Sequence, residues 1–144
     1  MWTVAAFYRF VDLAGRREAL QAALKNLKDE HSLCGIILVA DEGINGTISA
    51  PTREGVMAAL DILVAEAGLE MDTVKWSTAS VQPFFKYKVR LKKEIITMKA
   101  PEADPTKRVG DYVTAENWNE LIARDDVILL DTRNRYETEL GTFK

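Results

Sequence analysis

The pattern of hydrophobic and polar positions predicts a strand, a helix and a hairpin in the first third of the chain. Residues 2–10 alternate between two faces, and both faces carry aromatic side chains, which is typical of a strand inside a sheet. Leucines recur at helical spacing within residues 14–30, so we expect an amphipathic helix there. The apolar run at residues 36–40 predicts a buried strand, and residues 47–50 predict its hairpin partner, with a turn at residues 42–46 between them.

The next stretch adds a second helix and two more strands. Thr52 is a good N-cap and Gly68 a good stop signal, and an apolar stripe lies between them. Residues 72–78 and 84–92 read as strands. The element order is β-α-β-β-α-β, which is that of a split βαβ or ferredoxin-like domain, and we place this domain at residues 1–95.

A different pattern follows this domain. Proline and acidic residues indicate a linker at residues 96–108, and residues 114–122 predict a short helix. The apolar run at residues 127–131 ends in an aspartate, which is typical of a buried strand that begins a site in an α/β domain. One strand cannot bury a core, so we expect residues 109–144 to be the first part of a second domain. The expected fold class is therefore α+β.

The composition is that of a soluble globular protein, with 47% hydrophobic and 28% charged residues. No apolar run approaches the roughly 20 residues needed to cross a bilayer, and no signal peptide is evident, so we expect a cytoplasmic protein without membrane contact. Cys34 is the single cysteine and His31 the single histidine, which predicts no disulfide and no metal site. Catalysis by this pair is disfavoured, because neither a glycine-rich loop nor a helix N-terminus lies beside Cys34 to activate its thiol.

Positive charge is concentrated in one stretch, although the formal net charge of the chain is −3. Residues 84–99 contain six basic side chains and a single acidic one. Four of them occupy alternate positions of the predicted strand, so they share one face: Lys86, Lys88, Arg90 and Lys92. The row is about 20 Å long at about 3.3 Å per residue, which suits the phosphates of a nucleic acid strand. The alternative is a solvated face whose lysines protect an edge strand from aggregation.

Two further sets of residues are candidates for nucleic-acid contact. In the turn at residues 42–46, the backbone N–H groups of Gly43, Asn45 and Gly46 could form a nest for a phosphate, although an ordinary hairpin turn is the alternative. In the first strand, Arg9 could add a charge, and Phe7 and Tyr8 could stack on bases.

Several segments resemble one known family. The sequence Asp-Thr-Arg-Asn at residues 131–134, with Glu137 and Gly141, resembles the opening of a rhodanese domain. Residues 109–143 as a whole, Glu-Gly-Ile-Asn-Gly-Thr at 42–47 and the basic stretch at 88–95 resemble the rhodanese-like bacterial tRNA uridine hydroxylases.

This resemblance implies that the intact protein hydroxylates uridine-34 of tRNA at C5, with molecular oxygen as co-substrate and no other visible cofactor. The catalytic cysteine of that family lies in a glycine-rich loop, which would fall beyond Lys144. We therefore expect no catalytic residue in this chain, an inactive fragment, and a role in tRNA binding. Asp131, Arg133 and Glu137 would position the missing loop, with Asp131 accepting backbone N–H bonds and Arg133 pairing with Glu137. The alternatives are a rhodanese-type sulfurtransferase and a non-catalytic RNA-binding module, and the oligomeric state is left open.

Overall fold

The computed structural model describes residues 1–95, 99–100 and 107–143. Its contacts divide the chain into two compact units, Met1–Val109 (unit 1) and Gly110–Lys144 (unit 2). Most of the linker expected at residues 96–108 lies outside the described residues, so the expected domain boundaries stay a prediction.

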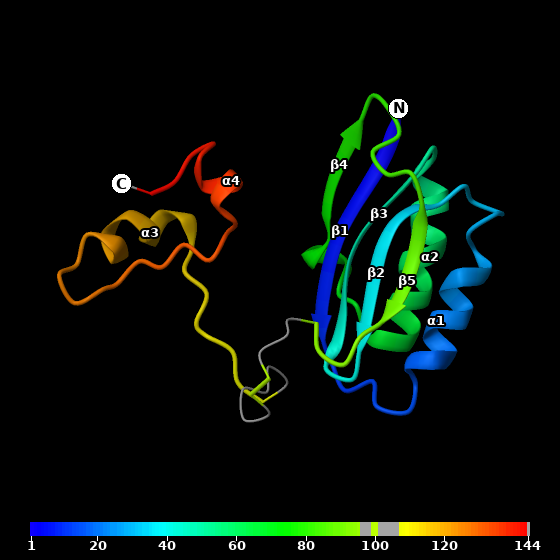
Figure 1. Ribbon diagram of the computed structural model, residues 1–144, viewed down its shortest axis with the longest axis horizontal. Helices are drawn as coiled ribbons and strands as arrows, with labels where there is room; N and C mark the ends of the chain where they lie inside the picture. Colours follow the sequence, from blue (N-terminus) through cyan, green and yellow to red (C-terminus); the bar gives the residue numbers. More distant parts are fainter. Residues whose placement is uncertain (96–98, 101–106, 144) are drawn as a thin grey trace. The chain divides into compact units, whose positions relative to one another are not determined.

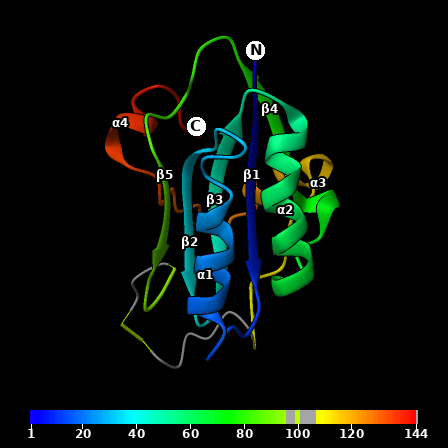
Figure 2. The same cartoon turned by 90° about the vertical axis from the view of Figure 1, so that its right-hand side faces the viewer.

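Unit 1 is a five-stranded sheet with α1 and α2 on one face (Figures 1 and 2). The strand order is β4-β1-β3-β2-β5, and all neighbours are antiparallel except β2 and β5, which are parallel. In chain order the elements are β1 (Trp2–Phe10), α1 (Arg17–Asn26), β2 (Cys34–Ala40), β3 (Gly43–Ala50), α2 (Arg53–Ala67), the 3-10 helix η1 (Met71–Thr73), β4 (Lys75–Ala79) and β5 (Tyr87–Leu91).

The expected α+β, ferredoxin-like fold is confirmed. The first four strands and two helices follow the order β-α-β-β-α-β, and β5 adds a parallel strand beside β2. Several boundaries differ from expectation, and the strand expected at residues 84–92 is the shorter β5 (Tyr87–Leu91). The helix expected at residues 14–30 is shorter, because Ala14 and Arg16 donate their N–H groups into a turn, to the Asp12 carboxylate and the Leu13 carbonyl. The strand expected at 72–78 begins as η1, and the hairpin strand begins at Gly43 rather than at residue 47.

The caps predicted for α2 are present. The hydroxyl of Thr52 accepts a hydrogen bond from the N–H of Gly55 at 3.2 Å, and Gly68 ends the helix in the left-handed conformation, with φ of 61°. The predicted apolar stripe faces the sheet and is buried: Val56, Leu60, Leu63 and Ala67.

The core lies between the sheet and the two helices. Alternate residues of the central strands point into it, including Phe7 of β1, Ile37 of β2 and Ile48 of β3, and all three are buried. Burying a side chain of this size stabilises a fold by about 1.5–3 kcal/mol. The opposite face of the sheet is not covered by α1 or α2 (Figures 1 and 2).

Gly46 of β3 makes the packing of Phe7 possible. A Cβ atom at Gly46 would lie 2.9 Å from Cζ of Phe7 and 2.8 Å from the carbonyl oxygen of Ile36. Both distances are shorter than real Cβ contacts, and one of the opposing atoms is backbone. The absence of a side chain at Gly46 therefore lets the Phe7 ring approach β3 closely.

Unit 2 contains α3 (Ala115–Ile122) and α4 (Arg135–Thr138). Trp118 of α3 packs on Phe143, with ring centroids 5.4 Å apart. The prediction of a buried strand at residues 127–131 is wrong. These described residues form no strand, and Ile128 and Leu130 are 94% and 78% exposed. A strand needs a neighbour to pair its backbone groups, and the described residues of unit 2 supply none.

We predict that Gly46→Ala lowers the free energy of unfolding by about 1–3 kcal/mol, because the added methyl group overpacks a close contact. Chemical denaturation would measure the change. Gly110→Ala is the matched control: a Cβ atom at Gly110 meets no atom within 4 Å, so stability should stay within about 0.5 kcal/mol of the unmodified chain. Equal stability of the two variants would contradict the packing argument.

Candidate nucleic-acid interface

The basic row predicted from the sequence lies along β5, at one edge of the sheet. Lys88 and Arg90 are within β5, Lys86 and Lys92 flank it, and all four are exposed. Tyr87 and Val89 point to the other face and are buried, at 8% and 5% exposure. The predicted alternation is therefore confirmed from residue 86 to 90. Phe85 does not continue the buried side of this alternation, since it precedes Tyr87 by two positions and is 98% exposed.

Three sets of contacts hold β5 in place. On its inner edge the backbone pairs with β2, through bonds from Gly35 N–H to the Lys86 carbonyl and from Lys92 N–H to the Val39 carbonyl, both 2.9 Å. On its outer edge the Gln21 amide of α1 donates to the Val89 carbonyl at 2.8 Å. The Tyr87 hydroxyl donates to the Leu24 carbonyl at 3.2 Å. These bonds fix the direction in which the basic side chains extend.

The basic side chains of β5 have no ionic partner within the part of the chain that the structure describes. No ion pair or side-chain hydrogen bond of Lys88 or Arg90 with a described residue is present, and both are exposed. An acidic chain thus presents an uncompensated row of positive charge, which favours binding of an anion.

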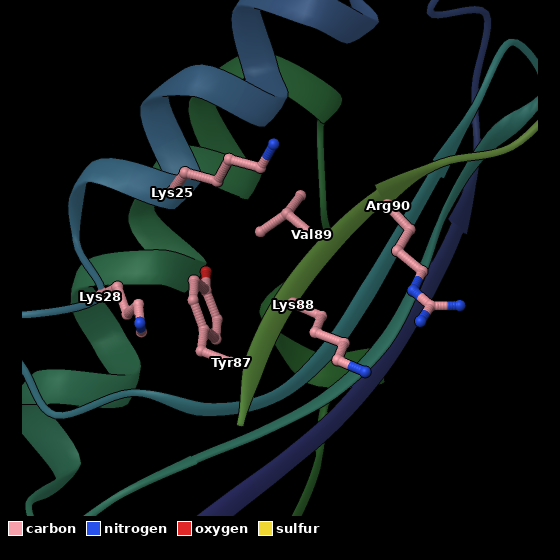
Figure 3. A pocket seen from close by; sticks show the side chains of 6 residues that line it. All are labelled: Lys25, Lys28, Tyr87, Lys88, Val89 and Arg90. Atoms are coloured by element: carbon pink, nitrogen blue, oxygen red, sulfur yellow. The ribbon is translucent and has the colours of Figure 1, made fainter. Parts of the chain in front are cut away.

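A shallow pocket of about 400 Å³ lies where α1 meets β5 (Figure 3). Tyr87 and Val89 form its apolar part, and burial raises the pKa of Tyr87, so its hydroxyl stays neutral. Lys25 of α1 and Lys28, which follows that helix, approach from one side, whereas Lys88 and Arg90 extend from the other side of β5. The four cations therefore do not converge on one point, and the pocket is not a compact site for a single anion.

Arg9 does not lie with the basic row, and the charge expected from it is already paired. Its guanidinium pairs with the Glu70 carboxylate at 2.6 Å. Arg9 occupies the same face of β1 as Phe7, which is buried in the core, so Phe7 is not available for stacking either. Tyr8 points to the opposite face and is 47% exposed.

The phosphate nest expected at Gly43, Asn45 and Gly46 is also wrong. All three residues lie in β3, which pairs with β1 on one side and β2 on the other. The backbone N–H groups of a central strand are used in the sheet, so they are not free to bind a phosphate. The connecting turn consists of Asp41 and Glu42 alone.

Cys34 and His31 do not form a catalytic pair. Cys34 is buried, and its sulfur contacts the Gln82 amide nitrogen at 3.1 Å. His31 Nε2 lies 3.8 Å from a Glu30 carboxylate oxygen. Among the described residues, no group of three or more His, Cys, Asp or Glu side chains could hold a metal ion.

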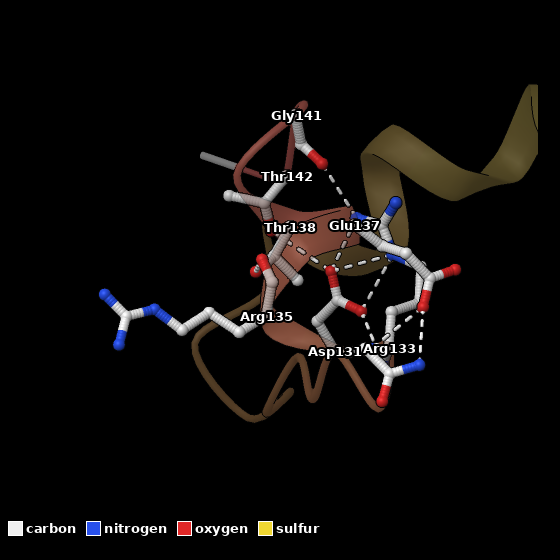
Figure 4. Close-up of polar contacts among 8 residues, drawn as sticks. Asp131, Arg133, Arg135, Glu137, Thr138, Gly141 and Thr142 are labelled. Atoms are coloured by element: carbon white, nitrogen blue, oxygen red, sulfur yellow. Dashed lines mark hydrogen bonds and ion pairs between the residues drawn. The ribbon is translucent and has the colours of Figure 1, made fainter.

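In unit 2, Asp131 and Arg133 form the centre of a polar cluster (Figure 4). The Arg133 guanidinium donates to both oxygens of Asp131, at 3.0 and 2.7 Å, and to the Gly141 carbonyl at 2.9 Å. Asp131 also accepts from the Arg133 backbone N–H and the Thr142 hydroxyl, both at 3.1 Å. The cluster thus ties the segment after residue 131 to the segment after α4.

The direct partner of Arg133 is Asp131, and not Glu137 as expected. Glu137 instead forms a capping box with Asn134, whose backbone N–H and side-chain amide both donate to its carboxylate. The expectation that Asp131 accepts a backbone N–H bond is confirmed. Whether these three residues position a catalytic loop stays a prediction.

Unit 1 is therefore an α+β domain of ferredoxin-like topology, and its edge strand β5 is basic. The chain belongs to the family described as the UPF0176 acylphosphatase like domain, which matches residues 2–95.

Two relatives and one solved structure illustrate what the chain is similar to. It is 49% identical to the tRNA uridine(34) hydroxylase of Rhizobium leguminosarum bv. trifolii, over 98% of this chain and 45% of that protein. It is 46% identical to the enzyme of the same name from Deinococcus radiodurans, over 99% of this chain and 46% of that protein. The acylphosphatase of Bacillus subtilis matches with a TM-score of 0.43 and 9% identity, over 62% of this chain and 99% of that one. The chain spans about half the length of the curated relatives it matches.

We predict that the Asp131 carboxylate titrates below its usual range, because the hydrogen bonds from Arg133 lower its pKa. Since the folded pKa is depressed, the stabilisation of the turn is present above the unfolded pKa of about 3.9 and is lost as pH falls through the folded value. Arg133→Gln should raise the pKa of Asp131 toward about 3.9, as followed by NMR of the side-chain carboxyl carbon. Arg135→Gln is the control, because Arg135 pairs with Glu139 instead. An unchanged Asp131 titration in the Arg133 variant would rule out the pair as the cause.

Proposed function

We propose that this chain is the N-terminal part of a tRNA uridine(34) hydroxylase and that it contributes a surface that binds tRNA. Relatives with that name are 44–49% identical over nearly the whole chain, which supports the assignment over sulfur transfer. The observation that carries the binding role is the exposed basic row Lys86, Lys88, Arg90 and Lys92, which β5 holds in an extended line.

The reaction itself is part of the proposal. A hydroxylase of uridine-34 adds a hydroxyl group at C5. We expect molecular oxygen to be the co-substrate, with an external two-electron donor reducing its second oxygen atom to water. The described residues take part through binding and not through the chemical step, because the one thiol of the chain, Cys34, is buried. The resemblance of residues 131–137 to a rhodanese opening stays a prediction. In the part of the chain that the structure describes, no helix is long and apolar enough to cross a bilayer.

Phosphate binding by the row would have a definite salt dependence. Each phosphate neutralised on a single strand contributes about −0.7 to the slope of log K against log salt concentration. Contacts to the unpaired loops of tRNA follow this rule. A change in slope therefore reports the number of phosphate contacts, separately from any change in affinity that has another cause.

We predict that the double variant Lys88→Gln and Arg90→Gln binds tRNA more weakly and with a slope flattened by roughly 1.4, if each side chain contacts one phosphate. Fluorescence anisotropy at several salt concentrations would measure both. Lys25→Gln with Lys28→Gln is the matched control, since it removes the same charge from the α1 side of β5 (Figure 3). Its slope should stay close to that of the unmodified chain. Wild-type affinity and slope in the Lys88 and Arg90 variant, with the fold intact, would exclude the row as the tRNA site.

We also predict that the 144-residue chain does not hydroxylate tRNA by itself. The test is incubation with unmodified tRNA under air, followed by mass spectrometry of the nucleosides, with a full-length relative as the positive control. Formation of 5-hydroxyuridine by the chain alone would show that a residue within it performs the chemistry, and Cys34→Ser would then be the first variant to make.

A further inference from the structure

The face of the sheet opposite α1 and α2 has a composition that the basic row alone does not explain. In the strands of unit 1, the side chains that point to this face include three cations and no carboxylate, although the chain as a whole is acidic. The cations are at the two edges, with Lys75 on β4 and Lys88 and Arg90 on β5. Aromatic, aliphatic, small and uncharged polar side chains lie between them.

Both ends of this face are occupied by the chain itself. At one end Gln82, in the connection from β4 to β5, contacts Cys34, and both Cys34 and its neighbour Ser49 are buried. At the other end the Ile95 N–H donates to the Glu42 carboxylate at 2.6 Å. The exposed part of the face is therefore a strip across the middle of the sheet.

Strand register defines what this strip contains. Tyr8 of β1 lies opposite Asn45 of β3, Asn45 lies opposite Leu38 of β2, and Leu38 lies beside Arg90 of β5. A second row runs parallel to it through Ala6, Thr47, Ile36 and Lys88. Tyr8, Asn45, Lys88 and Arg90 are exposed, and the residues between them are half-buried. The distance from β1 to β5 is about 14 Å, at about 4.8 Å per strand, which a short run of unpaired nucleotides can span.

We propose that this strip binds unpaired nucleotides of an RNA strand that crosses the sheet. A base stacks on the exposed ring of Tyr8, which the ring of Phe10 supports edge-on at a centroid distance of 6.1 Å. The Asn45 amide, which both donates and accepts, hydrogen-bonds the edge of a base. Arg90 and Lys88 bind the phosphates on the far side of the strip. This inference rests on the proposed function, because it names the part of tRNA that the surface takes.

Charge favours RNA over a second copy of the chain as the occupant. The core of a protein interface is depleted of charged residues, whereas this strip is bounded by cations at both edges of the sheet. A second copy would also bring like charges together. A polyanion with exposed bases is complementary both to the cations at the two edges and to the exposed ring of Tyr8.

Replacement of Tyr8 separates stacking from phosphate binding. The probe is a labelled, unstructured oligoribonucleotide of about 12 nucleotides, within the usual site sizes. Tyr8→Leu should weaken its binding about ten-fold or more with no change in salt slope, because a ring and not a charge is lost. Tyr8→Phe should bind like the unmodified chain. Tyr136→Leu, the same change at an exposed tyrosine of unit 2, is the matched control. A fully paired RNA duplex should bind equally to the unmodified chain and to Tyr8→Leu.

The possible outcomes distinguish this inference from the proposed function. A folded Tyr8→Leu variant could bind the oligoribonucleotide like the unmodified chain while the Lys88 and Arg90 variant shows a flattened salt slope. That result would overturn the inference that the strip binds bases and would leave the basic row as the tRNA site. No binding of RNA by the unmodified chain would overturn both. If Tyr8→Leu unfolds the protein, Asn45→Ala and Tyr8→Phe test the inference instead. Weaker binding of the oligoribonucleotide by Asn45→Ala, with unchanged binding by Tyr8→Phe, would support it. A dimer that Tyr8→Leu dissociates, seen by light scattering, would identify the face as an interface between copies and overturn the inference.

Discussion

The parallel pairing of β5 with β2 is the interaction on which the rest of the surface depends. Gly35 lies beside Tyr87 and Ile37 beside Val89, so the buried side chains of both strands point to the same side. Because side chains alternate along a strand, Lys88 and Arg90 then have to point outward. A shift by one residue would turn both cations toward the core, where an unpaired charge is very unfavourable. The burial of Tyr87 and Val89 thus sets the position of the positive charge.

Protection of an edge strand accounts for only part of this arrangement. Lysines on an edge strand prevent pairing with another chain, and β5 is an edge strand. The Gln21 amide already occupies the outward carbonyl of Val89, so one edge group is blocked without any charge. Protection of the edge strand also does not require the central strands β1, β2 and β3 to lack carboxylates on the face opposite the helices. These positions nevertheless carry no carboxylate. A binding role for a polyanion accounts for both observations.

The sequence predicted what depends on local pattern and missed what depends on long-range partners. Alternation of polar and apolar residues, helix caps and apolar stripes are local features of a sequence. The fold class, the basic row and the ends of α2 could therefore be predicted from the sequence alone. The partner of Arg9 is Glu70, which is distant along the chain, and no local rule points to it. Arg133 had acidic neighbours on both sides, and spacing alone could not choose between Asp131 and Glu137. The prediction of a strand at residues 127–131 was wrong because a strand needs a second segment to pair with its backbone N–H and C=O groups.

The residues around Gly46 show why the phosphate nest expected from the glycines does not form. The glycines suggested a turn with free N–H groups, but β3 is a central strand, and its backbone is already hydrogen-bonded on both sides. Recognition on this face therefore has to come from side chains. In β3 the inward position at Gly46 leaves room for Phe7, while the adjacent outward position holds the exposed amide of Asn45. The same strand thus closes the core on one side and, through Asn45 and its neighbour Tyr8, offers polar and aromatic groups on the other.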